Sequence, residues 1–184
     1  ARPALMLETL EGMLGSATMA RVMRTYHERF RYGHPRGADF FAVAAEVSGR
    51  ELDDFFARTV ASPGVVDPAI LGLTSEKAPQ ARGKVVQDGS EVEIDEEKAA
   101  LLERAADESE TRSYRSVVEL RQRGELILPV EVELTFDGQE PERRLWDDGS
   151  RWAKWEFERP EKLLEVRLDP DGKLALDANR LNNA

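Results

Sequence analysis

The apolar residues of this chain change their spacing near Asp67, and this change limits what the chain can fold into. Before it they recur at helical intervals, as Leu7, Leu10 and Leu14 do. After it they alternate with polar residues, as in the stretch PVEVELTF, which is typical of a strand with one buried face. The pattern predicts an α+β fold in two segments. Residues 1–66 would be all-α, and residues 67–184 would form an antiparallel, Ig-like β-sandwich.

Capping signals divide the first segment into about four helices. Pro3 suits a first helical turn, and Gly15 suits the position just after a helix end. Ser16 is then a candidate N-cap for the second helix. Ser48 and Glu51 stand three residues apart, as in a capping box, and predict the start of the fourth helix.

Alternation and turn signals divide the second segment into short strands. The stretch KLLEVRLD places Leu164, Val166 and Leu168 on one predicted strand face. Another predicted strand shows the same alternation, with Tyr114, Ser116, Val118 and Leu120 along one face. Asp-Gly pairs supply turns, at positions 88–89, 137–138, 148–149 and 171–172. Residues at about 95–112 break the pattern, and their charge predicts a long, mobile and transiently helical insertion between two strands.

Composition narrows the classes of function. The formal net charge is -10, with 41% hydrophobic and 34% charged residues, which favours a soluble globular protein and no nucleic-acid partner. The basic stretch RTYHERFRYGHPR is interpreted as an exposed helix face, with a phosphate site as the alternative. No apolar run predicts a membrane span. Cysteine is absent, so thiol chemistry is excluded, while the compartment, cytoplasmic or periplasmic, stays open.

The side chains that could carry chemistry do not form a recognisable active site. His27 and His34 are the only histidines, and Gly33 and Pro35 interrupt the helix that would align them. Zinc needs three or four converging ligands, so structural roles are favoured for both. Asp53 and Asp54 are adjacent on a predicted helix and point in different directions, which argues against a paired acid and base.

Two further motifs have structural interpretations. The stretch DPDGKLALD lacks the ligand spacing and closing Glu of a calcium loop and predicts a turn. Trp146, Trp152 and Trp155 could form a stacking platform for a sugar or peptide, although core positions are favoured. The sequence therefore supplies no candidate catalytic, cofactor-binding or metal-ligating residue.

One long motif resembles a known family. The order LETLEGMLG followed by YHERFRYGHPRGADFFAVAAEVSGRELDDFF resembles the end of the catalytic domain in bacterial zinc aminopeptidases related to alanyl aminopeptidase (aminopeptidase N), in the gluzincin clan. The matching residues are Tyr26, Phe30, His34, Pro35, Asp39, Phe40, Ser48, Gly49, Leu52, Phe55 and Phe56. GELILPVEVELTFDG and DPDGKLALDANRLNN resemble the small sandwich that follows in that family. Arg36 departs from it, because a capping Thr is common there.

The resemblance implies a parent enzyme that uses zinc-bound water and a general-base Glu to release amino-terminal residues from peptides. Its His-Glu-x-x-His motif, its substrate-gripping strand and its oxyanion tyrosine have no counterpart here, so no functional residue is carried over. We expect zinc only in a longer parent, with the missing part preceding Ala1. Peptide substrate is likewise expected only for the parent.

The expected function is therefore that of a non-catalytic C-terminal fragment that scaffolds the parent's catalytic domain. The alternative is an interaction module from a catalytically inactive relative. A third possibility is an unrelated adaptor with a helical bundle and an Ig-like module. Apolar residues on several faces of the first two helices predict self-association or loose order there.

Overall fold

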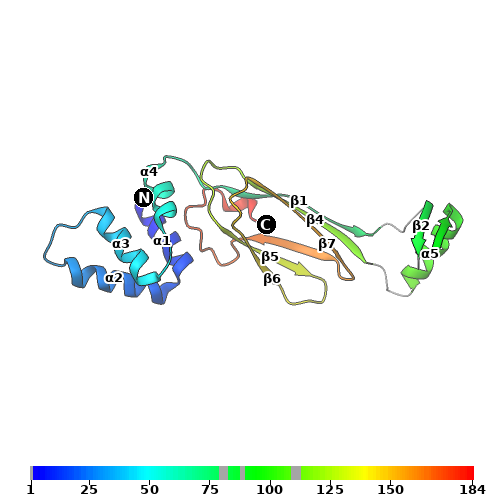
Figure 1. The fold of residues 1–184 in the computed structure, drawn as a ribbon, viewed down its shortest axis with the longest axis horizontal. Helices are drawn as coiled ribbons and strands as arrows, with labels where there is room; N and C mark the ends of the chain where they lie inside the picture. Colours follow the sequence, from blue (N-terminus) through cyan, green and yellow to red (C-terminus); the bar gives the residue numbers. More distant parts are fainter. Residues whose placement is uncertain (1, 79–82, 88–89, 109–112) are drawn as a thin grey trace.

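The computed structural model describes residues 2–78, 83–87, 90–108 and 113–184. Four helices come first and an antiparallel β-sandwich follows, which confirms the α+β fold in two segments (Figure 1). The first helices are α1 (Arg2–Leu14), α2 (Ser16–Phe30), α3 (Gly37–Ser48) and α4 (Asp53–Ala61). The sandwich strands are β1 (Pro68–Lys77), β4 (Tyr114–Gln122), β5 (Val130–Phe136), β6 (Glu142–Trp146), β7 (Trp152–Arg159) and β8 (Leu163–Leu168).

The helices pack around an aromatic cluster. Phe41 stacks on Phe56 with ring centroids 4.0 Å apart, and Tyr26 meets Phe40 edge to face at 5.4 Å. Such pairs add roughly 0.5–1.5 kcal/mol to the stabilisation from area burial. The expected apolar stripe on α1 faces inward: Leu10 is fully buried, and Leu7 and Leu14 are partly buried against the core.

The helix boundaries agree with some predicted caps and not with others. Gly15 does follow α1, in a left-handed conformation with φ 82°, but it also occupies the N-cap of α2, so Ser16 is a helical residue. The capping box at Ser48 and Glu51 is wrong. Ser48 ends α3, and Gly49 takes φ 66° with its N–H bonded to the carbonyl of Ala45. Because this left-handed residue turns the chain, the next helix starts only at Asp53.

The sandwich consists of two three-stranded antiparallel sheets, ordered β1-β4-β7 and β6-β5-β8. The predicted alternation is confirmed in β5, whose residues are buried at every second position. In β4, Ser116, Val118 and Leu120 are buried as expected. Leu164 was misassigned: it is 51% exposed, and Leu163 is buried in its place. The cause is a register shift opposite Thr135 and Phe136 that skips Leu164 in the pairing of β5 with β8.

Side chains close both sides of the sandwich. Ser75 accepts the N–H of Leu163 at 3.1 Å and shares a 2.7 Å hydrogen bond with Ser116 inside the fold. On the other side, Arg159 forms a two-pronged ion pair with Glu142 while its guanidinium lies 4.4 Å from the ring centroid of Phe136. The contacts of Ser75 with Leu163 and of Arg159 with Glu142 join strands of different sheets.

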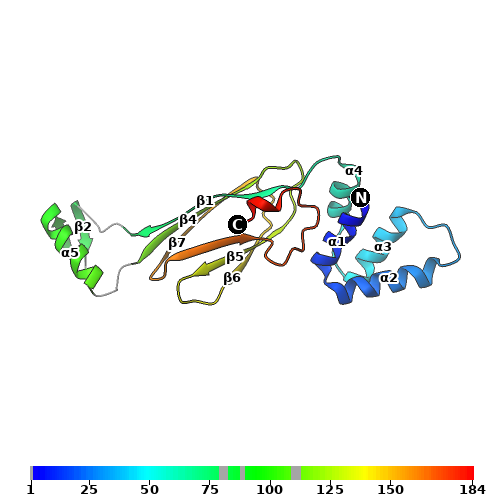
Figure 2. The ribbon, with the colours of Figure 1, turned by 180° about the vertical axis from the view of Figure 1, so that it is seen from behind.

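A small unit is inserted between β1 and β4. It contains an antiparallel pair, β2 (Gly83–Gln87) and β3 (Ser90–Ile94), and the helix α5 (Glu96–Glu108). It lies at the opposite end of the molecule from α1–α4 (Figures 1 and 2). The N–H of Ala78 donates to the carbonyl of Ser113 at 2.8 Å, so both ends of the insertion start from one place. The Asp-Gly pair at 88–89 and residues 109–112 lie outside the described residues.

Candidate functional site: a cleft between the helices and the sandwich

The histidine and aspartate side chains that the sequence offered for metal binding or acid–base chemistry do not lie together in the structure. His27 and His34 are exposed, and Asp53 and Asp54 lie exposed on the first turn of α4. Asp54 forms an ion pair with Arg58 at 2.8 Å, one helical turn later. Within the part of the chain that the structure describes, no group of three or more His, Asp or Glu could hold a metal ion.

The three tryptophans do not share one surface. Trp146 is buried, and its indole N–H lies 3.2 Å from both Asp148 and Ser150. Trp155 is half-buried on the inner face of its sheet. Trp152 is 56% exposed, with the guanidinium of Arg121 stacked 4.4 Å from its ring centroid. This arrangement favours core positions for the first two and disfavours a common stacking platform.

The helical segment and the sandwich share one continuous apolar core. Thr9 on α1 accepts the N–H of Leu176 at 3.0 Å, and Arg58 on α4 donates to the carbonyl of Ile127 at 3.1 Å. Gly12 lies so close to the C-terminal segment that a Cβ there would be 2.4 Å from the carbonyl oxygen of Lys173. The two segments are therefore in close backbone contact along α1.

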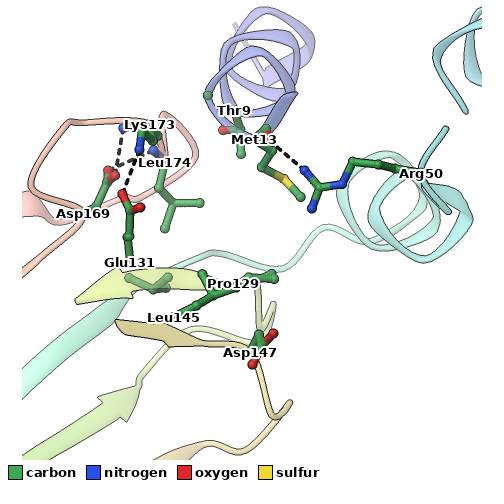
Figure 3. A pocket seen from close by; sticks show the side chains of 12 residues that line it. Thr9, Met13, Arg50, Pro129, Glu131, Leu145, Asp147, Asp169, Lys173 and Leu174 are labelled. Atoms are coloured by element: carbon green, nitrogen blue, oxygen red, sulfur yellow. Dashed lines mark hydrogen bonds and ion pairs between the residues drawn. The ribbon is translucent and has the colours of Figure 1, made fainter. Parts of the chain in front are cut away.

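Beside this contact a cleft of about 300 Å³ opens between the two segments (Figure 3). Its apolar lining comes from both of them, namely Met13, Pro129, Val130, Leu145 and Leu174. Its charged lining is likewise shared, and consists of Arg50, Glu131, Asp147, Asp169 and Lys173.

On one side of the cleft, charges of both signs neutralise each other. The ammonium of Lys173 lies 2.8 Å from Glu131 and 2.9 Å from Asp171. Asp171 also receives two hydrogen bonds from Arg143, and these, with Lys173, hold the pKa of its carboxyl far below the usual range. The same carboxylates raise the pKa of Lys173. Each charged side chain of this exposed network thus has at least one partner of opposite sign.

Asp169 is a structural carboxylate at the base of the cleft. Its two oxygens accept the N–H groups of Lys173 and Leu174, each at 2.8 Å, while its own backbone takes a left-handed φ of 47°. Burial raises the pKa of this carboxyl, and the two backbone hydrogen bonds oppose that shift only in part. Asp169 thus shapes the turn after β8 and leaves no oxygen without a partner.

Arg50 and Asp147 are different, because each keeps unused hydrogen-bonding capacity. Arg50 donates one N–H to the carbonyl of Met13 at 2.7 Å, near the C-terminal end of α1, where a cation is favoured. Its other N–H groups have no partner among the described residues. Asp147 also has no partner among them, and it follows β6 directly.

A second, smaller cavity of about 100 Å³ adjoins the first, since Pro129 and Asp147 line both. Gln122 and Trp146 also line it. The amide of Gln122 donates to the carbonyl of Leu128 at 3.2 Å, whereas its side-chain oxygen accepts no hydrogen bond from the described residues. Asp147 therefore stands at the junction of two adjacent hollows.

Thr9 supplies a hydroxyl group to the lining of the cleft. A nucleophile needs a base within hydrogen-bonding reach, and Thr9, the hydroxyl that lines the cleft, has its oxygen bonded to a backbone N–H instead. Sequence patterns gave no signal for this site, because Arg50 and Asp147 come from separate segments and match no motif. Only the packing of α1 and α4 against the sandwich brings them to one cleft.

Comparison with protein-family models found none that matches this chain, and comparison with curated proteins found none either. Among the described residues, no helix is both long enough and apolar enough to cross a membrane.

Proposed function

We propose that this chain is the non-catalytic C-terminal scaffold of a zinc metallo-aminopeptidase-like protein, whose full polypeptide hydrolyses amino-terminal residues from peptides. The observation that carries the proposal is where the resembling residues lie. Tyr26, Phe40, Phe55 and Phe56 belong to the aromatic cluster at the centre of the helical segment. The resemblance thus rests on residues that pack, as a supporting element would require.

The contact between the two segments supports the same role. A shared apolar core and the close approach of Gly12 to Lys173 give the helices a firm base on the sandwich. Such a base would fix the position of the helices against the rest of the parent's catalytic domain. The partner of this chain would then be the rest of the parent polypeptide.

Zinc has no fitting set of ligands within the described part of this chain. The two histidines are exposed, and no carboxylate among the described residues pairs with either, whereas a zinc-bound histidine normally has such support. In our proposal, zinc and the chemistry that it supports belong to the longer parent.

The alternative is an interaction module in a parent that has lost its zinc motif. Leu101 and Leu102 on α5 favour it, because they are 61% and 40% exposed on a unit far from the helices. The two proposals differ in one feature, the presence or absence of His-Glu-x-x-His in the residues encoded upstream.

Two measurements test the scaffold proposal. The polypeptide that carries this chain should contain His-Glu-x-x-His upstream and should hydrolyse an aminoacyl p-nitroanilide. The isolated chain should not hydrolyse this substrate and should retain no equimolar zinc after dialysis. Tight zinc that disappears on replacing His27 or His34, or a parent without the motif, would refute it.

We also propose self-association through α1 and α2. Leu5 and Met23 are 38% and 46% exposed on these helices, and nothing among the described residues covers them. Light scattering coupled to size-exclusion chromatography should show a dimer that Leu5→Gln with Met23→Gln dissociates. Leu164→Gln, which removes an exposed leucine on β8, is the matched control. A monomer at every concentration would exclude the idea.

A further inference from the structure

Two charged side chains that line the cleft, Arg50 and Asp147, have no ion-pair partner among the described residues. Glu131 is paired with Lys173, Asp54 is paired with Arg58, and Asp169 is bonded to backbone amides. Arg50 has N–H groups to spare, and the carboxylate of Asp147 accepts no hydrogen bond from the described residues. A ligand of this cleft therefore meets one available cation and one available anion.

Part of the cleft lining is apolar. Leu145 is 56% exposed on the outer face of its sheet, and Pro129 and Leu174 line the cleft beside it (Figure 3). Figure 3 shows Arg50 on the helical side of the cleft, and Leu145 and Asp147 on the sandwich side. Covering a half-exposed leucine would favour binding through the hydrophobic effect.

These features select one ligand chemistry. A simple anion would gain Arg50 but would also meet the carboxylate of Asp147, and a simple cation would meet Arg50. A zwitterion with an apolar body satisfies both charges and covers the leucine. The cleft of about 300 Å³ is at the small end of ligand sites, and the adjoining hollow of about 100 Å³ extends it past Asp147.

We propose that this cleft binds a short peptide with free termini and an apolar side chain. Its carboxylate lies at Arg50, its ammonium lies at Asp147, and its side chain covers Leu145. Charge-assisted hydrogen bonds fix both ends, and the apolar floor selects the side chain. The inference is independent of the scaffold role, because every residue it uses belongs to this chain.

The test is a titration of the isotope-labelled full chain with leucyl-leucine, followed by amide chemical shifts. Blocking the amino end by acetylation, or the carboxyl end by amidation, should each weaken binding about tenfold, as expected for the loss of a charged hydrogen bond. Asp147→Asn should abolish the difference between free and acetylated peptide only. Arg50→Gln should abolish the difference between acid and amide only.

Controls separate this site from general effects. Arg24→Gln removes an exposed arginine of α2 and should change nothing. Leu145→Gln should weaken binding, whereas Leu164→Gln, an equally exposed leucine on another strand, should not. If Arg50→Gln loosens α1 by removing its bond to Met13, Arg50→Lys keeps a cation and should retain the preference for a free carboxylate.

Three results would overturn the proposal. The first is the absence of saturable shifts at millimolar peptide. The second is binding of free leucine as tight as that of the dipeptide, because the length would then be wrong. The third is an Asp147→Asn chain that still prefers the free amino terminus, because the ammonium would then lie elsewhere.

Discussion

Replacing Gly12 with alanine tests the contact between the helices and the sandwich. In an isolated helix this change would stabilise by about 1 kcal/mol, since glycine is a poor helix former. Here the new Cβ would be 2.4 Å from the carbonyl oxygen of Lys173 and 2.8 Å from its Cα, and side-chain carbons essentially never come within 3.0 Å of such atoms. Overpacking of this kind costs about 1–3 kcal/mol. The cost of the overlap exceeds the gain in helix propensity, so we expect the free energy of unfolding to fall by about 1 kcal/mol.

Urea denaturation measured with two signals provides the assay. All three tryptophans lie in β6 and β7, so their fluorescence reports the sandwich, while far-ultraviolet circular dichroism is dominated by the helices. Gly12→Ala should lower the helical midpoint more than the fluorescence midpoint. Gly37→Ala is the matched control, because a Cβ there meets only the ring of Phe41, at an ordinary 3.7 Å.

Three further changes test other parts of the fold. Gly124→Ala places a Cβ 1.9 Å from the carbonyl oxygen of Val65 and should cost more than about 2 kcal/mol in the fluorescence melt, whereas Gly72→Ala meets nothing closer than 3.9 Å and should be nearly neutral. Asp39→Ala removes the 2.6 Å hydrogen bond from the N–H of Arg36 at the start of α3 and should cost about 1 kcal/mol, while Ser48→Ala should stay within about 0.5 kcal/mol; a larger loss from Ser48→Ala would restore the capping box. Arg115 and Lys154 hold the pKa of Glu156 at about 2 instead of 4.5, so its stabilising contribution is present above pH 4.5 and is lost as the pH falls through the folded pKa. At low salt, the free energy of unfolding from urea melts should therefore fall less between pH 4.5 and about 2 for Glu156→Gln than for the unsubstituted chain. High salt should remove this difference. An equal fall in the two chains would mean that the ion pairs do not form.

The sequence predicted those elements whose cause is local. A glycine after a helix and strict alternation in a strand act through the chain's own dihedral angles and side-chain directions, so Gly15 and β5 were predicted correctly. Leu164 was misassigned because a register shift depends on the partner strand, which the alternation alone does not contain. Ser48 was misassigned because Gly49 takes a left-handed φ of 66° and ends α3 there, and the next helix starts only at Asp53.

The cleft could not be predicted for the same physical reason. Arg50 and Asp147 have no common period or motif, and their separate segments meet only through tertiary packing. The close approach of Gly12 to Lys173, which sets one boundary of the cleft, would be invisible in any local pattern. The sequence also showed that no catalytic motif lies in this chain. A His-Glu-x-x-His motif upstream remains a prediction for the parent polypeptide.

The hydrogen bond between Ala78 and Ser113 makes β1 and β4 the two arms of one hairpin, with the whole β2–β3–α5 unit as its connection. The entropic cost of closing such a connection rises only slowly with its length, so the sandwich places little restriction on what is inserted there. This junction should therefore tolerate inserted segments of different length without a change in the register of Lys77 with Tyr114. A chain in which an Asn-Gly turn joins Ala78 to Ser113 should unfold at the same urea midpoint, followed by tryptophan fluorescence, as the unsubstituted chain. A sandwich that no longer folds would show that the inserted unit stabilises it.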